Sequence, residues 1–117
     1  MGNEYRNEDE IEDVIEKCKT KKIDIALGKN RKENMQFMLD HELMPCDIYD
    51  FVKKYIRKEH LHKGPVPDDK DKKRGPVWIF HICAFNTWCY VKIQIQNGGN
   101  LVHIISFHDQ DLGGRNE

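Results

Sequence analysis

The chain has 117 residues and a net charge of −1; 38% of its residues are hydrophobic and 33% are charged. This length predicts one domain, and the near-neutral charge excludes a protein that binds nucleic acid through its overall charge. No N-terminal apolar run resembles a signal peptide and no stretch resembles a membrane span, so we expect a cytoplasmic protein without a membrane partner. The four cysteines form no C-x-x-C pair and predict buried free thiols.

Charge is unevenly distributed along this near-neutral chain. Residues 4–16 are mostly acidic, whereas residues 53–74 carry nine lysines and arginines against four acidic residues. A basic segment can bind RNA even when the whole protein is close to neutral. It can equally be the solvated surface of a helix and a loop. Charge alone leaves both interpretations open.

The first half of the chain predicts helices around one short strand. Apolar residues recur at helical spacing in three segments and alternate in one segment that follows the first helix. Asn30 is suited to capping the second helix, and Pro45 stands near the start of the third. The predicted elements are an acidic amphipathic helix at 8–19, within an N-terminal segment 1–20, and then, within 21–58, a strand at 21–27 and helices from 30 to about 41 and from 46 to 58.

The second half predicts a basic loop followed by a sheet. Residues 59–76 contain three prolines and two glycines and show no periodicity. Three apolar segments follow, the last two joined by the turn residues 97–100. The predicted strands lie at 77–84, 87–96 and 101–107, within a sheet segment 77–108 and before a polar tail at 109–117. The sequence thus predicts one α+β domain in which an antiparallel β-meander packs on N-terminal helices.

The strand predicted at 87–96 has two different faces, because successive side chains point to opposite sides of a sheet. The apolar face, which should meet the helices, carries Cys89, Val91, Ile93 and Ile95. The opposite face carries Trp88, Tyr90, Lys92, Gln94 and Gln96. Aromatic rings interleaved with a cation and amides suit stacking on bases and holding phosphates. The alternative is that Trp88 and Tyr90 pack beneath the long loop.

The order of motifs in this part of the chain resembles a known family. The runs CYVKIQI at 89–95 and HIISFH at 103–108 are similar to the closing hairpin of MqsR-type toxins. The runs EHLHKGPVPD and GPVWIF, within 59–80, resemble the loop and strand before that hairpin, and the resemblance as a whole covers residues 22–108. It implies a RelE-like fold and the toxin component of a type II toxin–antitoxin system. Such a toxin is an endoribonuclease (an mRNA interferase, hence a hydrolase) that needs no metal or other cofactor.

The resemblance also implies partners and a catalytic set. The partners are mRNA, free or on the ribosome, and a cognate antitoxin protein. Lys63 matches the family's loop lysine and Tyr90 matches its strand tyrosine. His108 stands where the family has a C-terminal lysine, and Ile79 stands where it has a glutamine. Because isoleucine cannot do the work of glutamine, the chemistry would be redistributed or lost.

Cleavage of RNA without a metal needs a base, an acid and cations beside the phosphate. We assign His108 as the acid or the base, because an ordinary histidine titrates near neutral pH. Tyr90 can act as a base only if Lys92, on the same strand face, lowers its pKa. Lys63 would hold the scissile phosphate, with Arg74 as a helper.

Other residues are candidates for binding RNA rather than for catalysis. Trp78 or Trp88 could stack on a base, and Gln94 shares the polar strand face. We therefore predict that Arg74, Trp78, Trp88 and Gln94 bind RNA. Asp68 is better suited to a turn or a cap than to catalysis.

The turn between the last two strands decides which way His108 points. A three-residue turn pairs Gln96 with Asn100, which places Tyr90 opposite Ser106 and His108 on the same face as Tyr90. A two-residue turn shifts the pairing by one residue and directs His108 to the helices. The sequence leaves both registers open.

Two other functions compete with RNA cleavage. A zinc site could use His81, Cys83, Cys89 and His103, but His81 and Cys83 alternate in phase with apolar residues, which predicts the core, and zinc-ligand spacing is missing. His60 and His62 would only favour a helix end. The second alternative is a non-catalytic RNA- or protein-binding module, such as an inactive toxin relative or a phage-type inhibitor. In either case the acidic N-terminal helix could shield the basic loop or contact a partner.

Overall fold

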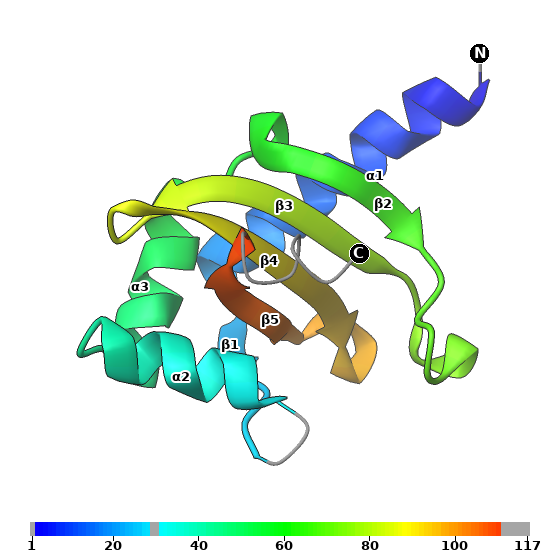
Figure 1. The fold of residues 1–117 in the computed structure, drawn as a ribbon. Coiled ribbons are helices and arrows are strands. Elements are labelled where there is room, and N and C mark those ends of the chain that lie inside the picture. Colours follow the sequence, from blue (N-terminus) through cyan, green and yellow to red (C-terminus); the bar gives the residue numbers. More distant parts are fainter. Residues whose placement is uncertain (1, 29–30, 111–117) are drawn as a thin grey trace.

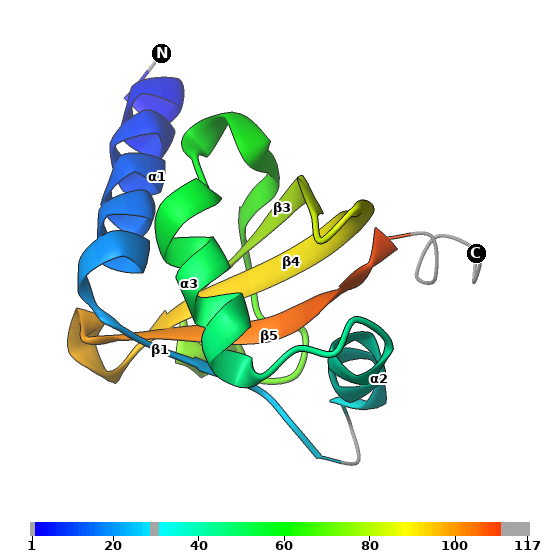
Figure 2. The same ribbon diagram turned by 90° about the vertical axis from the view of Figure 1, so that its left-hand side faces the viewer.

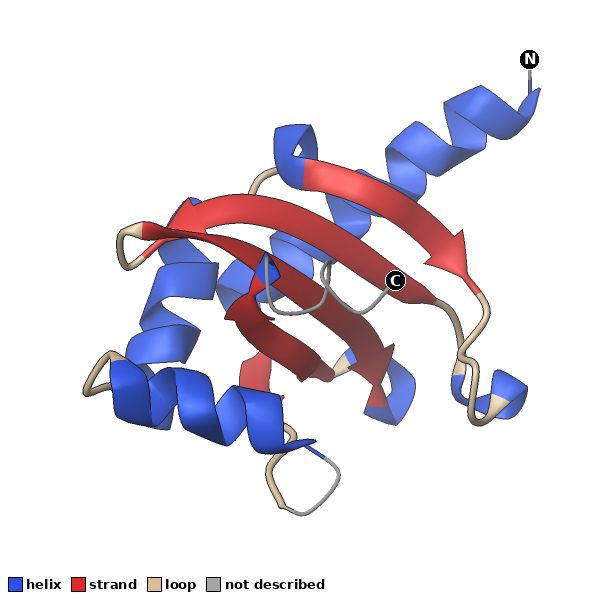
Figure 3. Ribbon diagram, in the orientation of Figure 1, coloured by secondary structure: helices blue, strands red, loops and turns tan. Residues whose placement is uncertain are grey.

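The computed structural model of the protein describes residues 2–28 and 31–110. In this part of the chain three α-helices accompany a five-stranded sheet, which confirms the predicted α+β class (Figures 1 and 3). The helices are α1 (Gly2–Thr20), α2 (Lys32–Asp40) and α3 (Pro45–Tyr55). The strands are β1 (Lys22–Ile25), β2 (Leu61–Val66), β3 (Val77–Ala84), β4 (Thr87–Gln96) and β5 (Leu101–Asp109).

The sheet is mixed and larger than the predicted meander. Its strand order is β1-β5-β4-β3-β2, with β1 parallel to β5 and the other neighbours antiparallel. The prediction of a purely antiparallel, three-stranded sheet was therefore wrong. β2 arises within the segment expected to be a loop, because an edge strand tolerates the proline and glycine that hid it. Irregular pairing with β3 at two places lets this strand form without an alternating pattern.

Helices α1 and α3 lie side by side on one face of the sheet, and α2 packs near β5 (Figure 2). Ile48 and Val52 of α3 are fully buried, and so are Val91 and Ile93 of β4. The predicted apolar face of β4 thus meets the helices, as alternation requires. We call the face of the sheet turned away from α1 and α3 the outer face.

The prediction of which β3 side chains face the helices was wrong. Phe80 and Ile82 pack in the helix-side core, whereas His81 is partly exposed and Cys83 is exposed on the outer face. The error has a physical cause: β3 is apolar on both faces at its start, because Val77 is also buried on the outer face. Alternation cannot assign a side when both sides are apolar.

The termini and the acidic helix differ in detail from the prediction. α1 begins at Gly2 rather than near residue 8, and its residues Glu8 and Glu12 form ion pairs with Lys58 at 2.8 and 3.0 Å. The acidic helix therefore touches the start of the basic segment. The predicted cap at Asn30 and the tail beyond residue 110 lie outside the described residues.

The cysteine prediction was half right. All four cysteines are free, but only Cys18 and Cys89 are buried, while Cys46 and Cys83 are exposed. Burial raises the pKa of the Cys18 and Cys89 thiols to about 12, so both stay protonated and unreactive at neutral pH. Within the described residues, no helix is both long and apolar enough to cross a membrane.

Candidate active site

A bulge in β5 decides which residues face outward near its end. Four residues join β4 to β5, so Gln96 pairs with Leu101, one residue away from the register that a three-residue turn would give. Continued unchanged, that register would set Phe107 opposite Tyr90. Ile105 is an extra residue, and beyond it Tyr90 pairs with His108. The bulge thus brings His108 to the outer face.

Asn34 of α2 holds the bulge in place. Its side chain is buried, with only 1% exposed. Its amide nitrogen donates hydrogen bonds to the carbonyl oxygens of Ala26 and Ile105, each at 2.9 Å, and its amide oxygen accepts one from the Phe107 backbone N–H at 2.9 Å. The side chain therefore provides hydrogen-bond partners for backbone groups at the β5 bulge and just after the end of β1. Without Asn34 these buried groups would lose these partners.

Four rings form a row across four neighbouring strands of the outer face. They belong to His62 of β2, His81 of β3, Tyr90 of β4 and His108 of β5. The irregular pairing of β2 between Leu61 and Lys63 interrupts its alternation, so His62 and Lys63 can share this face. The His62 and His81 rings stack with centroids 4.0 Å apart, and the Tyr90 and His108 rings stack at 5.4 Å. The His81 and Tyr90 centroids are 6.0 Å apart. We call these four residues the ring row.

A second row runs beside the ring row on the same face. Lys63 pairs with Ile79, Ile79 with Lys92, and Lys92 with Ser106, so directly opposite residues share one side of the sheet. The predicted catalytic residues Lys63, Tyr90, Lys92 and His108 consequently lie in two adjacent rows. Two amines next to three imidazoles and a phenol give this face both proton-transfer groups and cations.

The pKa values of two residues in the ring row are shifted. Burial, and then the nearby His62, lower the pKa of His81, so that His81 is a neutral imidazole at neutral pH. Burial, and then the Asp69 carboxylate, raise the pKa of Tyr90. Tyr90 could act as a base only if Lys92 lowered its pKa, and this condition is not met: Tyr90 keeps its proton and can donate a hydrogen bond.

Of the predicted RNA-binding residues, two are exposed and two are buried. Trp88 is half exposed on the outer face, with its ring centroid 6.3 Å from that of His81. Trp78 is only 4% exposed and packs in the helix-side core, so its predicted stacking on a base is corrected. Gln94 is 1% exposed, so it too lacks the surface to contact RNA. Arg74 is exposed and forms an ion pair with Asp71 at 3.4 Å.

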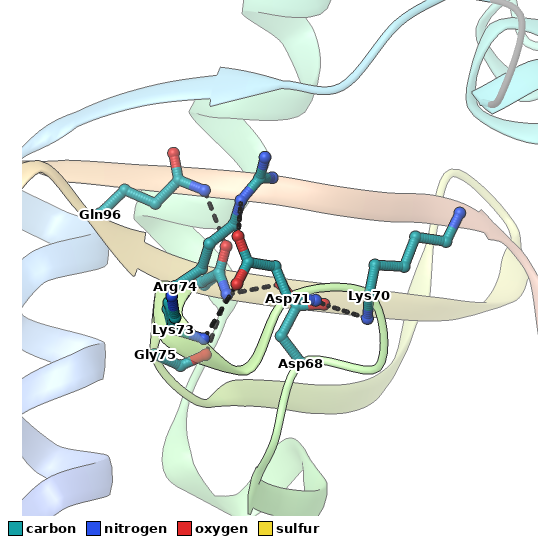
Figure 4. Close-up of polar contacts among 8 residues, drawn as sticks. Asp68, Lys70, Asp71, Lys73, Arg74, Gly75 and Gln96 are labelled. Carbon is teal, nitrogen blue, oxygen red and sulfur yellow. Dashed lines mark hydrogen bonds and ion pairs between the residues drawn. The ribbon is translucent and has the colours of Figure 1, made fainter.

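Gln94 serves the structure of the loop at 67–76 instead. Its amide nitrogen donates to Asp68 Oδ2 and to the Gly75 carbonyl, both at 3.0 Å; the two acceptor residues, Asp68 and Gly75, are labelled in Figure 4. The other Asp68 oxygen accepts from the backbone N–H groups of Lys70 and Asp71. Asp68 thus has the turn role predicted for it. Through its hydrogen bond with Gln94 it also holds the loop over the outer face.

Sequence reasoning missed His62 and His81 as site residues. His62 was hidden because β2 has no alternating pattern, and His81 because β3 was assigned the wrong phase. Trp78, Phe80 and Ile82 also alternate, so the opposite phase was an available signal. No three His, Cys, Asp or Glu side chains within the described residues lie close enough together to hold a metal ion. No family model, curated protein or solved structure matches the chain.

Proposed function

We propose that the protein is an endoribonuclease that cleaves single-stranded RNA without a metal ion. The observation that carries the proposal is the ring row, in which Tyr90 stands between His81 and His108 with Lys92 beside it. Two histidines on either side of a hydrogen-bond donor suit a phosphodiester bond that needs a base, an acid and charge stabilisation.

In this reaction His81 is the base, because its lowered pKa keeps it neutral. It takes the proton of the ribose 2′-OH, and the 2′-oxygen then attacks the phosphorus. Tyr90 donates its O–H to a non-bridging oxygen of the phosphate, and Lys92 and Lys63 stabilise the added negative charge. Preorganised donors of this kind often supply the largest part of catalysis.

His108 is the acid on the other side of Tyr90. It gives a proton to the 5′-oxygen as the bond between phosphorus and that oxygen breaks. The products are a 2′,3′-cyclic phosphate and a free 5′-hydroxyl, so atoms and protons balance without a cofactor. Trp88, half exposed beside His81, supplies a surface for an unpaired base to stack on.

As a toxin of a toxin–antitoxin pair, the protein would cleave mRNA until an antitoxin covers the site. The resemblance to MqsR-type toxins supports this role, and so does the outer face, where proton-transfer groups and cations gather. The fold has the α+β layout of helices against a sheet that a RelE-like toxin requires. An antitoxin that restrains cleavage would have to cover the ring row or displace one of its strands.

The test is incubation of the purified protein with a long single-stranded RNA in EDTA. The wild type should produce discrete fragments that end in cyclic phosphate, and His81→Ala and His108→Ala should lose at least about 100-fold in rate. His60→Ala is the matched control, because His60 accepts a bond from the Arg57 N–H within its own turn. Intact RNA with the folded wild type would reject the proposal.

One observation favours a second function, a non-catalytic binding module. Ile79 occupies the centre of the row between Lys63 and Lys92, where it adds an apolar side chain to an otherwise polar row. An RNA- or protein-binding surface tolerates such a residue more readily than an active site does. Retained RNA affinity with no cleavage, unchanged by His81→Ala, would select this function.

A further inference from the structure

A small cavity opens between the loop at 67–76 and the outer face, and no residue of the ring row lines it. Its volume is about 120 Å³. One water molecule needs at least about 10–15 Å³, so the cavity can hold a group of several heavy atoms. Its charged lining residues are Arg31, Asp68, Asp69, Lys70, Arg74 and Lys92.

The cavity is predominantly cationic. Four of its side chains are lysine or arginine and two are aspartate. Asp68 accepts hydrogen bonds from the backbone N–H groups of Lys70 and Asp71 and from the Gln94 amide, and these bonds help to lower its pKa. Even when Asp71, the ion-pair partner of Arg74, is counted, four cations face three carboxylates, so an anion is the ligand that this charge favours.

His103 completes one wall of the cavity in a fixed orientation. Its Nδ1 lies 2.6 Å from Asp24 Oδ1 on the neighbouring strand β1. This contact occupies Nδ1 and leaves Nε2 as the ring nitrogen that can meet a ligand. A ring held in this way needs little reorganisation when a ligand binds.

Lys92 connects the cavity to the ring row. It lines the cavity, and it lies two residues from Tyr90 on the same face of β4. Two residues of a strand span about 6.6 Å, which is close to the spacing of successive phosphates in an extended nucleic-acid strand. Asp69, from the rim of the cavity, is also close enough to raise the pKa of Tyr90.

We propose that this cavity binds the phosphate of a nucleotide that flanks the cleaved bond, so that the substrate is an RNA strand longer than a dinucleotide. The inference rests on the proposed ribonuclease function and deepens it. Lys70 and Arg74 of the loop then hold the flanking phosphate, while Lys92 lies between it and the scissile phosphate.

The experiment compares two substrates and three proteins. A dinucleotide carries only the cleaved phosphodiester, whereas a tetranucleotide with the same central step adds a flanking nucleotide on each side. For the wild type, kcat/KM should be at least about tenfold higher for the tetranucleotide, since a charge-assisted hydrogen bond contributes that much. The double variant Lys70→Ala/Arg74→Ala should lose most of this ratio. Lys73→Ala, an exposed neighbour that does not line the cavity, should keep it.

A second measurement separates failure of this inference from failure of the proposed function. Affinities for 2′-O-methyl versions of both oligonucleotides, which cannot be cleaved, report the flanking phosphate without catalysis. The wild type could cleave neither RNA and still bind the longer analogue more tightly, with this preference lost in the double variant. That result would support the subsite and reject the nuclease function. A ratio that the double variant leaves unchanged, in cleavage or in binding, overturns the subsite.

Discussion

Tyr90 and His108 are direct partners on neighbouring strands, with ring centroids 5.4 Å apart and ring planes 14° from parallel. The pairing exists only because Ile105 bulges out of β5 and Asn34 satisfies the backbone around it. A side chain on α2 thus determines which residue lies beside the central tyrosine of the outer face.

Replacing Tyr90 by phenylalanine removes the hydroxyl and keeps the ring. Loss of one preorganised donor to the phosphate should lower kcat about 100-fold, with little change in the unfolding midpoint. Single-turnover cleavage of RNA measures the effect. Tyr55→Phe, at an exposed tyrosine of α3, is the matched control and should cleave at the wild-type rate. Equal rates for Tyr90→Phe and wild type would remove the hydroxyl from the mechanism.

The rate of cleavage should depend on the neutral form of His81. Its pKa is lowered from the ordinary value, so the base is lost only when the pH falls below about 6.5. The acidic limb of a plot of kcat/KM against pH should therefore rise through a midpoint below about 6.5. In His81→Gln this rising limb should vanish along with most of the activity. If the limb persists unchanged in the variant, another group is the base.

Asn34→Ala should destabilise the protein by about 2–3 kcal/mol, because it leaves buried backbone groups at Ala26, Ile105 and Phe107 without partners. Urea unfolding measures the loss. Gln36→Ala on the same helix removes only an exposed contact with Asp40 and should cost far less. In the folded fraction of Asn34→Ala, NMR contacts between the Tyr90 and His108 rings should weaken. Unchanged contacts between the two rings would show that the bulge forms without Asn34.

Asp68→Asn should loosen the loop at 67–76, because an amide nitrogen would then face the Gln94 donor. The Asp68 pKa is lowered on folding, so its carboxylate stabilises the protein above the ordinary pKa near 3.9, and this contribution disappears as the pH falls through the folded value. The unfolding midpoint of the variant should therefore be lower than that of wild type at pH 7, and the gap should narrow at pH 3. Asp69→Asn, at the exposed neighbour, should show no such gap.

Gly64→Ala should displace β2 from the sheet. Gly64 has φ of +140°, and an added Cβ would lie 3.0 Å from the Val77 carbonyl oxygen and 3.1 Å from Trp78 Cα. Neither backbone atom can move without distorting β3, so β2 should shift. The shift would carry His62 away from His81 and Lys63 away from Ile79. Hydrogen exchange of the β2 amides should accelerate in this variant, whereas Lys63→Ala should leave it near wild type. Unchanged exchange in Gly64→Ala would mean that the strand adapts.

Short-range patterns were sufficient for the elements whose signals are local. Residues 77–84 and 87–96 were predicted as strands with the bounds they have in the structure, because apolar residues and turn residues mark both ends. The polar face of β4 followed from period-two alternation alone, and with it the position of Tyr90 and Lys92. Helices α2 and α3 followed from helical spacing, although their ends moved by a few residues.

Contacts between distant segments decided the rest. The sequence by itself determined an α+β chain whose central strand presents Tyr90 and Lys92 on a polar face. Only the tertiary structure placed His62, His81 and His108 in line with Tyr90, since this needed an edge strand, the phase of a strand apolar on both faces, and a bulge held from another helix. A residue's face depends on pairing register, and register here depends on hydrogen bonds between Asn34 and backbone groups more than 70 positions away.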